Sequence, residues 1–229
     1  MAEEKDQPVV DVQETIGKAE RYVEENKQSL SIIIGAVVLL VGGYFAWTKL
    51  YLAPLEEEAQ AKMFAAERYF EKDSINKAIN GDGDEKHPGF KAIIDDYGLT
   101  ASGNLAHMYL GLCYLHTGKY EDAVNELKEY DGDDLILAPI SVGAMGDAYS
   151  EMGKQDEAID QYLKAAEAAK NDFTTPIYLM KAAMLYESQA KYADALKLYE
   201  QLKTDYPEAR EGRDVEKYIS RAKAKGGIE

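Results

Sequence analysis

Residues 110–123 read Leu110-Gly111-Leu112-Cys113-Tyr114-Leu115-His116-Thr117-Gly118-Lys119-Tyr120-Glu121-Asp122-Ala123, and this stretch decides the expected fold. Its spacing predicts a first helix that ends near Gly118 and a second helix that begins directly after it. The same order of small and aromatic residues returns twice further along the chain. The second copy has Met145, Gly146, Tyr149, Gly153, Ala158 and Tyr162, and the third has Ala182, Ala183, Tyr186, Ala190, Tyr192, Ala195 and Tyr199.

The small residues of the repeat have a packing role. Ala123, Ala158 and Ala195 stand 35 and 37 residues apart, a period that is typical of stacked helical hairpins. Each copy also has glycine or alanine on its first helix, which allows the second helix of the hairpin to approach closely. The sequence therefore predicts an all-α chain of stacked hairpins, and it shows no strand pattern.

Three copies of Leu-Gly-x-x-Tyr, Gly-x-Tyr-x-x-Ala and a large residue four positions later resemble the tetratricopeptide repeat. The first copy matches well, the second matches in most positions, and the third has Ala190 where the turn glycine belongs. The tryptophan that the family carries near the start of each repeat is replaced by His107, Val142 and Leu179. The resemblance implies a solenoid of helical hairpins that acts by binding other proteins.

A second stretch, residues 28–48, contains no charged side chain and is apolar on all sides. At a rise of about 1.5 Å per residue, roughly 20 such residues match the hydrocarbon layer of a membrane. A buried core helix and a cleaved signal peptide are the alternatives. The length argues against the first, and an acidic arm before the stretch argues against the second. We expect a retained transmembrane helix at residues 29–51, with the N-terminus inside the cell and the C-terminal part outside.

We expect three regions in the chain. Residues 1–28 form a cytoplasmic arm with a short amphipathic helix, and residues 54–229 form the solenoid. The stripe on the arm consists of Val12, Ile16, Ala19 and Val23, and it fits either a helix that rests on the membrane surface or a docking helix for a membrane subunit. The solenoid divides into a divergent hairpin at 54–97, repeats at about 104–135, 139–172 and 176–207, and a C-terminal capping helix at 208–225. Seven to nine helices are expected after the span.

The charge balance limits the partners. The chain has 42 acidic and 26 basic residues and a net charge of −16. Such a balance opposes the binding of nucleic acid and of anionic lipid headgroups. Cys113 is the only cysteine, so an intramolecular disulfide cannot form.

No motif points to catalysis or to a bound metal. His107, Cys113 and His116 lie close together in the sequence, but their places in the repeat favour packing over metal binding. The loop at residues 80–88 has alternating aspartates like a calcium loop. It lacks the required glycine, and Lys91 stands where the closing glutamate belongs. We therefore expect no enzyme activity, no metal and no cofactor.

In repeats of this family the first helices line the concave face of the solenoid. The register predicts an apolar, methionine-rich protein-binding groove there, interrupted by Asp147, Ser150, Glu151 and Glu187. Methionine suits surfaces that accept varied apolar partners. The alternative is that the superhelix closes and these side chains pack on one another. The predicted groove residues are Leu105, Met108, Leu112, Leu115, Ile177, Met180 and Met184.

One N-terminal span followed by an acidic tetratricopeptide solenoid resembles the YfgM-like ancillary subunits of the SecYEG translocon. This resemblance implies a single-pass protein of the bacterial inner membrane with its repeats in the periplasm. It would act with Sec translocon subunits and a membrane-anchored prolyl-isomerase-like chaperone on newly exported client proteins. A structural scaffold that tethers an envelope complex is the alternative function. A cytosol-facing import receptor is disfavoured, because no basic clamp for acidic peptide tails is present.

Overall fold

The computed structural model describes residues 12–229, apart from the side chains of residues 12–15 and 19. The chain divides into two units, residues 1–54 and residues 55–229. Residues 1–11 of the predicted cytoplasmic arm lie outside the described part. All regular structure in residues 12–229 is helical.

The first unit contains the apolar stretch. Helix α1 spans Val12–Ala46, and a short π-helix, η1, spans Trp47–Leu52. One helix in the described part of the chain is long and apolar enough to cross a membrane. Its apolar side chains are exposed on all sides, with Ile32 at 73%, Leu39 at 77% and Leu40 at 74%. In the predicted stripe of the arm, Ile16 and Val23 are exposed, and the side chains of Val12 and Ala19 lie outside the described part.

The sequence places a helix start at Pro54, but α2 (Ala53–Glu71) follows η1 with no loop between them. The π pattern is seen in the N–H of Ala53, which donates to the carbonyl of Thr48, five residues earlier. Proline cannot donate a backbone hydrogen bond, and an α-helix that contains it is disturbed in the preceding turn. The locally widened turn accommodates this disturbance.

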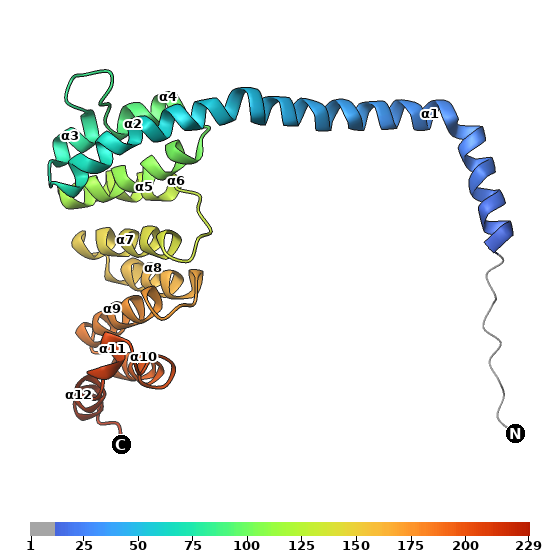
Figure 1. The fold of residues 1–229 in the computed structure, drawn as a ribbon. Coiled ribbons are helices and arrows are strands. Elements are labelled where there is room, and N and C mark those ends of the chain that lie inside the picture. Colours follow the sequence, from blue (N-terminus) through green and yellow to red (C-terminus); the bar gives the residue numbers. More distant parts are fainter. Residues whose placement is uncertain (1–11) are drawn as a thin grey trace, which may run out of the picture. The chain divides into compact units, whose positions relative to one another are not determined.

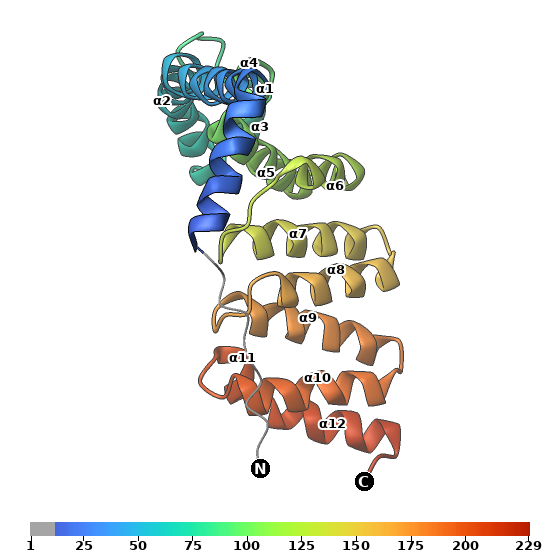
Figure 2. The same cartoon turned by 90° about the vertical axis from the view of Figure 1, so that its right-hand side faces the viewer.

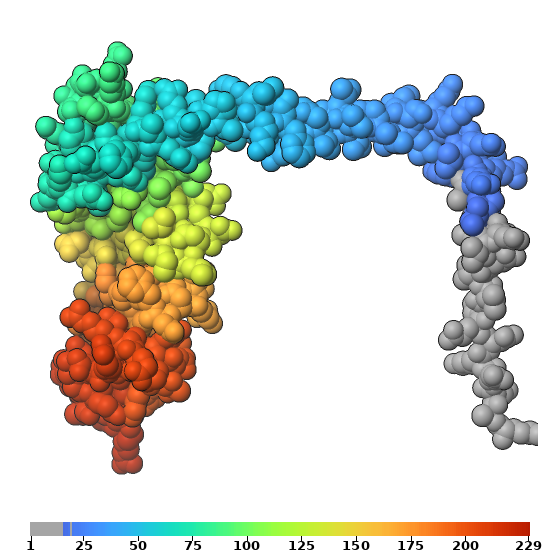
Figure 3. Space-filling model, in the orientation of Figure 1, coloured from blue at the N-terminus to red at the C-terminus, as the bar shows by residue number. Residues whose placement is uncertain are grey.

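The second unit is a solenoid whose helices follow one another in sequence order (Figures 1 and 3). Residues 55–229 hold eleven helices, more than the seven to nine expected. The excess arises because the second half of the leading hairpin divides into α3 and α4, and the C-terminal cap divides into α11 and α12. The helices after α2 are α3 (Ile75–Asn80), α4 (Phe90–Tyr97), α5 (Ala101–His116), α6 (Tyr120–Glu129), α7 (Leu137–Glu151), α8 (Gln155–Ala168), α9 (Thr174–Ser188), α10 (Tyr192–Asp205), α11 (Arg210–Arg213) and α12 (Glu216–Gly226).

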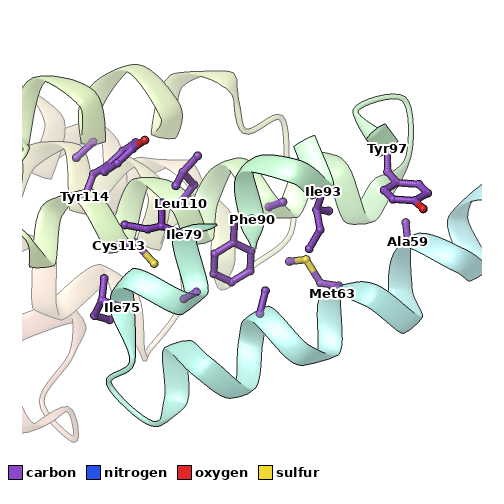
Figure 4. Close-up of a cluster of buried hydrophobic side chains, with 14 of the residues drawn as sticks. Ala59, Met63, Ile75, Ile79, Phe90, Ile93, Tyr97, Leu110, Cys113 and Tyr114 are labelled. Atoms are coloured by element: carbon purple, nitrogen blue, oxygen red, sulfur yellow. The ribbon is translucent and has the colours of Figure 1, made fainter. Parts of the chain in front are cut away.

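The leading hairpin is held together by an apolar cluster and by Glu58, and Glu56 ties it to the first full repeat. Figure 4 shows the fully buried ring of Phe90 among Met63, Ile79 and Ile93. The Ser102 backbone N–H and hydroxyl donate to Glu56 at 3.1 and 2.7 Å. The Tyr97 hydroxyl donates to Glu58 at 2.8 Å. These two glutamates of α2 therefore bind neighbouring helices, Glu58 binding α4 and Glu56 binding α5.

The predicted close approach within hairpins is present at both repeat glycines. A Cβ atom added to Gly111 would lie 3.2 Å from the carbonyl oxygen of Ala123 and 2.6 Å from Cγ of Leu127. A Cβ atom on Gly146 would lie 3.3 Å from the carbonyl oxygen of Ala158. Any larger residue would therefore push the second helix of the hairpin away. This contact explains the pairing of glycine and alanine in the first two copies.

Candidate functional site

The first helices of the three repeats, α5, α7 and α9, lie next to one another along the solenoid (Figure 2). Between them and the second helices is an open hollow of about 430 Å³. We call it the inter-repeat hollow. It is lined by Leu115, Tyr120, Asp147, Ser150, Glu151, Tyr162 and Lys181. Four of these residues, Leu115, Asp147, Ser150 and Glu151, were predicted to face the concave side.

An ion pair lines the inter-repeat hollow. The ammonium group of Lys181 donates to both carboxylate oxygens of Asp147, at 2.6 and 2.8 Å. The Tyr162 hydroxyl donates to the same carboxylate at 2.6 Å. Burial, together with this hydrogen bond, raises the pKa of Tyr162, so the phenol stays protonated. The ammonium group also lies 5.4 and 5.9 Å from the ring centroids of Tyr162 and Tyr178.

Lys181 was absent from the predicted surface. The prediction followed the apolar residues of α9 and described the groove as apolar with a few acids. Ile177, Lys181 and Met184 share one face of a helix at steps of four and three. This spacing is the signal that could have identified the lysine.

The predicted groove residues differ in their exposure. The prediction that Met108 lines the groove is corrected by its burial, because its side chain is only 3% exposed. It packs with Leu127, Ala144 and Met145 in a core cluster between two repeats. A side chain in that position cannot contact a partner. Of the others, Met184 is exposed, at 47%, and the rest are half-buried against the core clusters. The half-buried residues are Leu105, Leu112, Leu115, Ile177 and Met180.

The predicted position of Glu187 is also corrected. It was expected in the groove, but it is buried beneath the C-terminal helix α12. Its carboxylate accepts hydrogen bonds from Arg221 at 2.7 Å and from the Tyr199 hydroxyl at 3.1 Å. The prediction failed because the partner of Glu187 lies 34 residues later, outside the repeat pattern. Glu187 therefore holds the end of the solenoid together.

The three residues considered for metal binding do not converge. His107 Nδ1 lies 2.8 Å from a carboxylate oxygen of Glu126, and His116 Nε2 lies 3.4 Å from Asp73. Cys113 is fully buried, and burial raises the pKa of its thiol to about 12. No group of three or more histidine, cysteine or acidic side chains suited to a metal occurs among residues 12–229.

The aspartates of the loop at residues 80–88 accept hydrogen bonds from the loop backbone and from α2. Asp82 accepts a hydrogen bond from the Tyr69 hydroxyl at 2.6 Å and from the backbone N–H of Asp84 at 3.0 Å. Asp84 accepts from the backbone N–H of Lys86 at 2.9 Å. These bonds are those of a closed polar turn.

The described residues offer contact surfaces. The inter-repeat hollow is open and mostly polar, Asp147 is paired with Lys181, and Glu151 accepts a hydrogen bond from Tyr120. Such a surface binds other chains through side-chain packing and a few polar contacts.

Comparison with known proteins agrees with this architecture. Residues 89–134 and residues 178–209 each match a tetratricopeptide repeat model. No curated protein matches the chain significantly. Among solved structures, the chain is similar to the nearly identical TPR-like repeats of a candidate kinesin light chain from Podosopora anserina. The identity is 17%, the match covers 75% of this chain and 89% of that chain, and the TM-score is 0.55.

A second similar structure is that of MamA protein, with 19% identity, coverage of 75% of this chain and 84% of that chain, and a TM-score of 0.53. At these identities the likeness shows the fold alone. The matched segments contain α4–α6 and most of α9 and α10, the hairpins that the sequence pattern identified. The chain is therefore a tetratricopeptide repeat protein.

Proposed function

We propose that this chain is a membrane-anchored protein-interaction module. The observation that carries the proposal is the apolar stretch of α1, which is exposed on all sides although it precedes a packed solenoid. An apolar surface of that size is stable in lipid and unfavourable in water. A retained span explains it, and tetratricopeptide repeats supply the interaction surface.

The finer proposal concerns the location and the partners. The combination of one N-terminal span with an acidic repeat solenoid supports a protein of the bacterial inner membrane whose solenoid is periplasmic. There it assists newly exported proteins, beside Sec translocon subunits and together with a membrane-anchored prolyl-isomerase-like chaperone. The anchor keeps the solenoid near the exit of the channel, so weak contacts act at a high effective concentration.

The contact surface of this proposal is the concave face around the inter-repeat hollow. Leu112, Leu115 and Met180 are half-buried and Met184 is exposed, so an apolar segment of a client can lie against them. The ion pair of Asp147 with Lys181 gives polar contacts at the centre of this surface.

The test replaces Met180 and Met184 together by Asp in the full-length protein. We expect copurification of exported clients to be lost while the helical circular dichroism signal remains. Asn76→Asp with Asn125→Asp is the matched control, because it adds the same charge at exposed positions of α3 and α6. Unchanged copurification in the Met180/Met184 variant would remove the concave face from the proposal.

The location has its own test. The loop at residues 80–88 is mostly exposed and gives a protease site in the solenoid. Protease added to intact spheroplasts is expected to cut there, and the intact N-terminal peptide of the mature protein is expected in its mass spectrum. Protection of the loop, or loss of residues 1–48 from the mature chain, contradicts the proposed topology.

A scaffold that tethers an envelope complex is the second candidate function. The burial of Met108 and Glu187 favours it, because part of the predicted groove is filled by the chain itself. Deleting residues 1–26 distinguishes the two functions. The scaffold loses its complex if it is held through the arm, whereas a client-binding protein keeps its clients.

A further inference from the structure

Three successive connections between hairpins carry large apolar side chains that the solenoid does not cover. Leu99 precedes α5 and is 68% exposed, and Phe173 precedes α9 and is 62% exposed. Between them, Leu135 and Ile136 precede α7 and are 66% and 38% exposed. We call these four residues the loop row. Figure 2 shows the α6–α7 and α8–α9 loops on one edge of the solenoid, opposite the turns within the hairpins.

Hydrogen bonds hold neighbouring loops of this edge together. The side-chain amide of Asn104, in the first turn of α5, donates to the carbonyl of Asp131 at 2.7 Å, and it accepts from the backbone N–H of Asp131 at 2.8 Å. The Asn171 amide donates to the carbonyl of Leu135 at 2.9 Å. The loops are therefore fixed relative to one another, and the side chains of the loop row project from a backbone of defined geometry.

The loop row is flanked by carboxylates. Asp131, Asp133 and Asp172 are exposed beside it, and none of them forms an ion pair with lysine or arginine among residues 12–229. The nearby Lys170 is paired with Glu167 at 3.0 Å. A surface that alternates exposed apolar residues with unpaired carboxylates is complementary to apolar residues flanked by lysine or arginine.

We propose that the loop row is a second docking surface, separate from the concave face, for a protein segment that carries apolar side chains flanked by basic residues. A bilayer is a poorer occupant, because the carboxylates are repelled by anionic headgroups. The inter-repeat hollow shares no residue with the loop row, so the two surfaces serve different partners. The acidic charge of the solenoid thus acts in partner choice as well as in solubility.

Photo-cross-linking of the full-length protein in membrane vesicles of its own cells tests the proposal. Benzoylphenylalanine replaces Phe173 in one variant and Leu135 in another, and it replaces the exposed Gln155, at the opposite edge, in the control. Mass spectrometry then identifies the cross-linked peptide. We expect positions 173 and 135 to give the same protein adduct, through a peptide with apolar residues and at least two basic residues, and position 155 to give none of it.

The electrostatic part has its own readout. The adduct yield is expected to fall several-fold between about 0.05 and 0.5 M salt, because the Debye length shortens from about 14 Å to about 4 Å. Asp131→Asn, Asp133→Asn and Asp172→Asn together are expected to lower it similarly at low salt. Adducts to lipid, to a second copy of this chain or to an acidic peptide overturn the proposal. So does the absence of any adduct, or a yield that neither salt nor the three substitutions change.

Discussion

Glu187 Oε1 lies 2.6 Å from Nε of Arg221, a contact that ties the last repeat helix α9 to the capping helix α12. The Glu187 side chain is 6% exposed, whereas Arg221 is 44% exposed. The carboxylate therefore depends on its partners for solvation, while the guanidinium can turn to water.

Arg221→Ala is expected to lower the free energy of unfolding by about 2 kcal/mol, because a buried carboxylate loses its strongest partner. The loss is expected in α12 first, since terminal elements of a solenoid contact only one neighbour. Hydrogen exchange of residues 216–226, in the full chain in detergent micelles, measures it. Lys203→Ala is the control, because Lys203 pairs with Glu216 at the surface, and such pairs contribute about 0–1 kcal/mol. Equal exchange in the two variants would contradict the role of Arg221.

The same carboxylate predicts a pH dependence. Burial opposes its ionisation, but hydrogen bonds from Arg221 and Tyr199 favour it more strongly, so the pKa of Glu187 lies below its ordinary value of 4.5. A carboxyl group with a lowered folded pKa stabilises the fold above its unfolded pKa. That contribution is lost as the pH falls through the folded pKa.

The wild-type protein should therefore be more stable than Glu187→Gln at neutral pH, and the difference should shrink below about pH 4.5. Urea unfolding at a series of pH values measures the difference. Glu157→Gln, at an exposed position of α8, is expected to follow the wild-type curve. A difference between wild type and Glu187→Gln that stays constant down to about pH 3 would mean that the ion pair contributes nothing.

Much of the solenoid could be predicted because its packing repeats. Gly111 and Gly146 were expected to admit a second helix, and at each of them the carbonyl of an anchoring alanine lies within 3.3 Å of the place that a Cβ atom would take. The spacing places four residues of the C-terminal cap inward: Val215, Ile219 and Ala222 are buried, and Tyr218 is half-buried. These contacts are local in sequence, so a period of about 35 residues determines them.

The repeat also explains the strain at Ala190, which stands where the other two copies have glycine. Its φ is 59°, close to the 74° of Gly118 and the 73° of Gly153. The left-handed region costs an L-residue about 1–2 kcal/mol. Ala190→Gly is therefore expected to raise the free energy of unfolding by about 0.5–1 kcal/mol, after the greater freedom of glycine in the unfolded chain is subtracted.

Gly153→Ala is the reciprocal control. A Cβ atom there would meet no atom within 4 Å, so only the backbone conformation is tested. We expect a loss of about 1 kcal/mol. Urea midpoints of both variants measure the effect, and a destabilised Ala190→Gly protein would show that the turn is not strained.

The candidate site was harder to predict than the fold, because it depends on contacts between repeats. Met108 has the spacing of a groove residue, yet α7 covers it, and a period within one hairpin contains no information about the next. Lys181 was missed because its partner Asp147 lies on the preceding repeat, 34 residues away. The loop row depends on the hydrogen bonds that Asn104 and Asn171 make to the loop between α6 and α7. No local sequence pattern specifies these bonds.

Cys113 gives a direct measurement of how tightly the first repeat is closed. Its side chain is fully buried, and burial raises the pKa of its thiol to about 12. At about pH 8 a reagent therefore cannot reach the sulfur, and the reactive thiolate is scarcely populated. We expect iodoacetamide to leave Cys113 unmodified in the native protein and to modify it fully in concentrated urea, as measured by intact mass. The control is Cys113→Ala with Ser188→Cys, which places one thiol at an exposed position of α9. That variant should react at least a hundredfold faster in native buffer. Equal native rates would mean that α5 opens readily, and the core packing around Phe90 and Leu110 would then be weaker than its burial indicates.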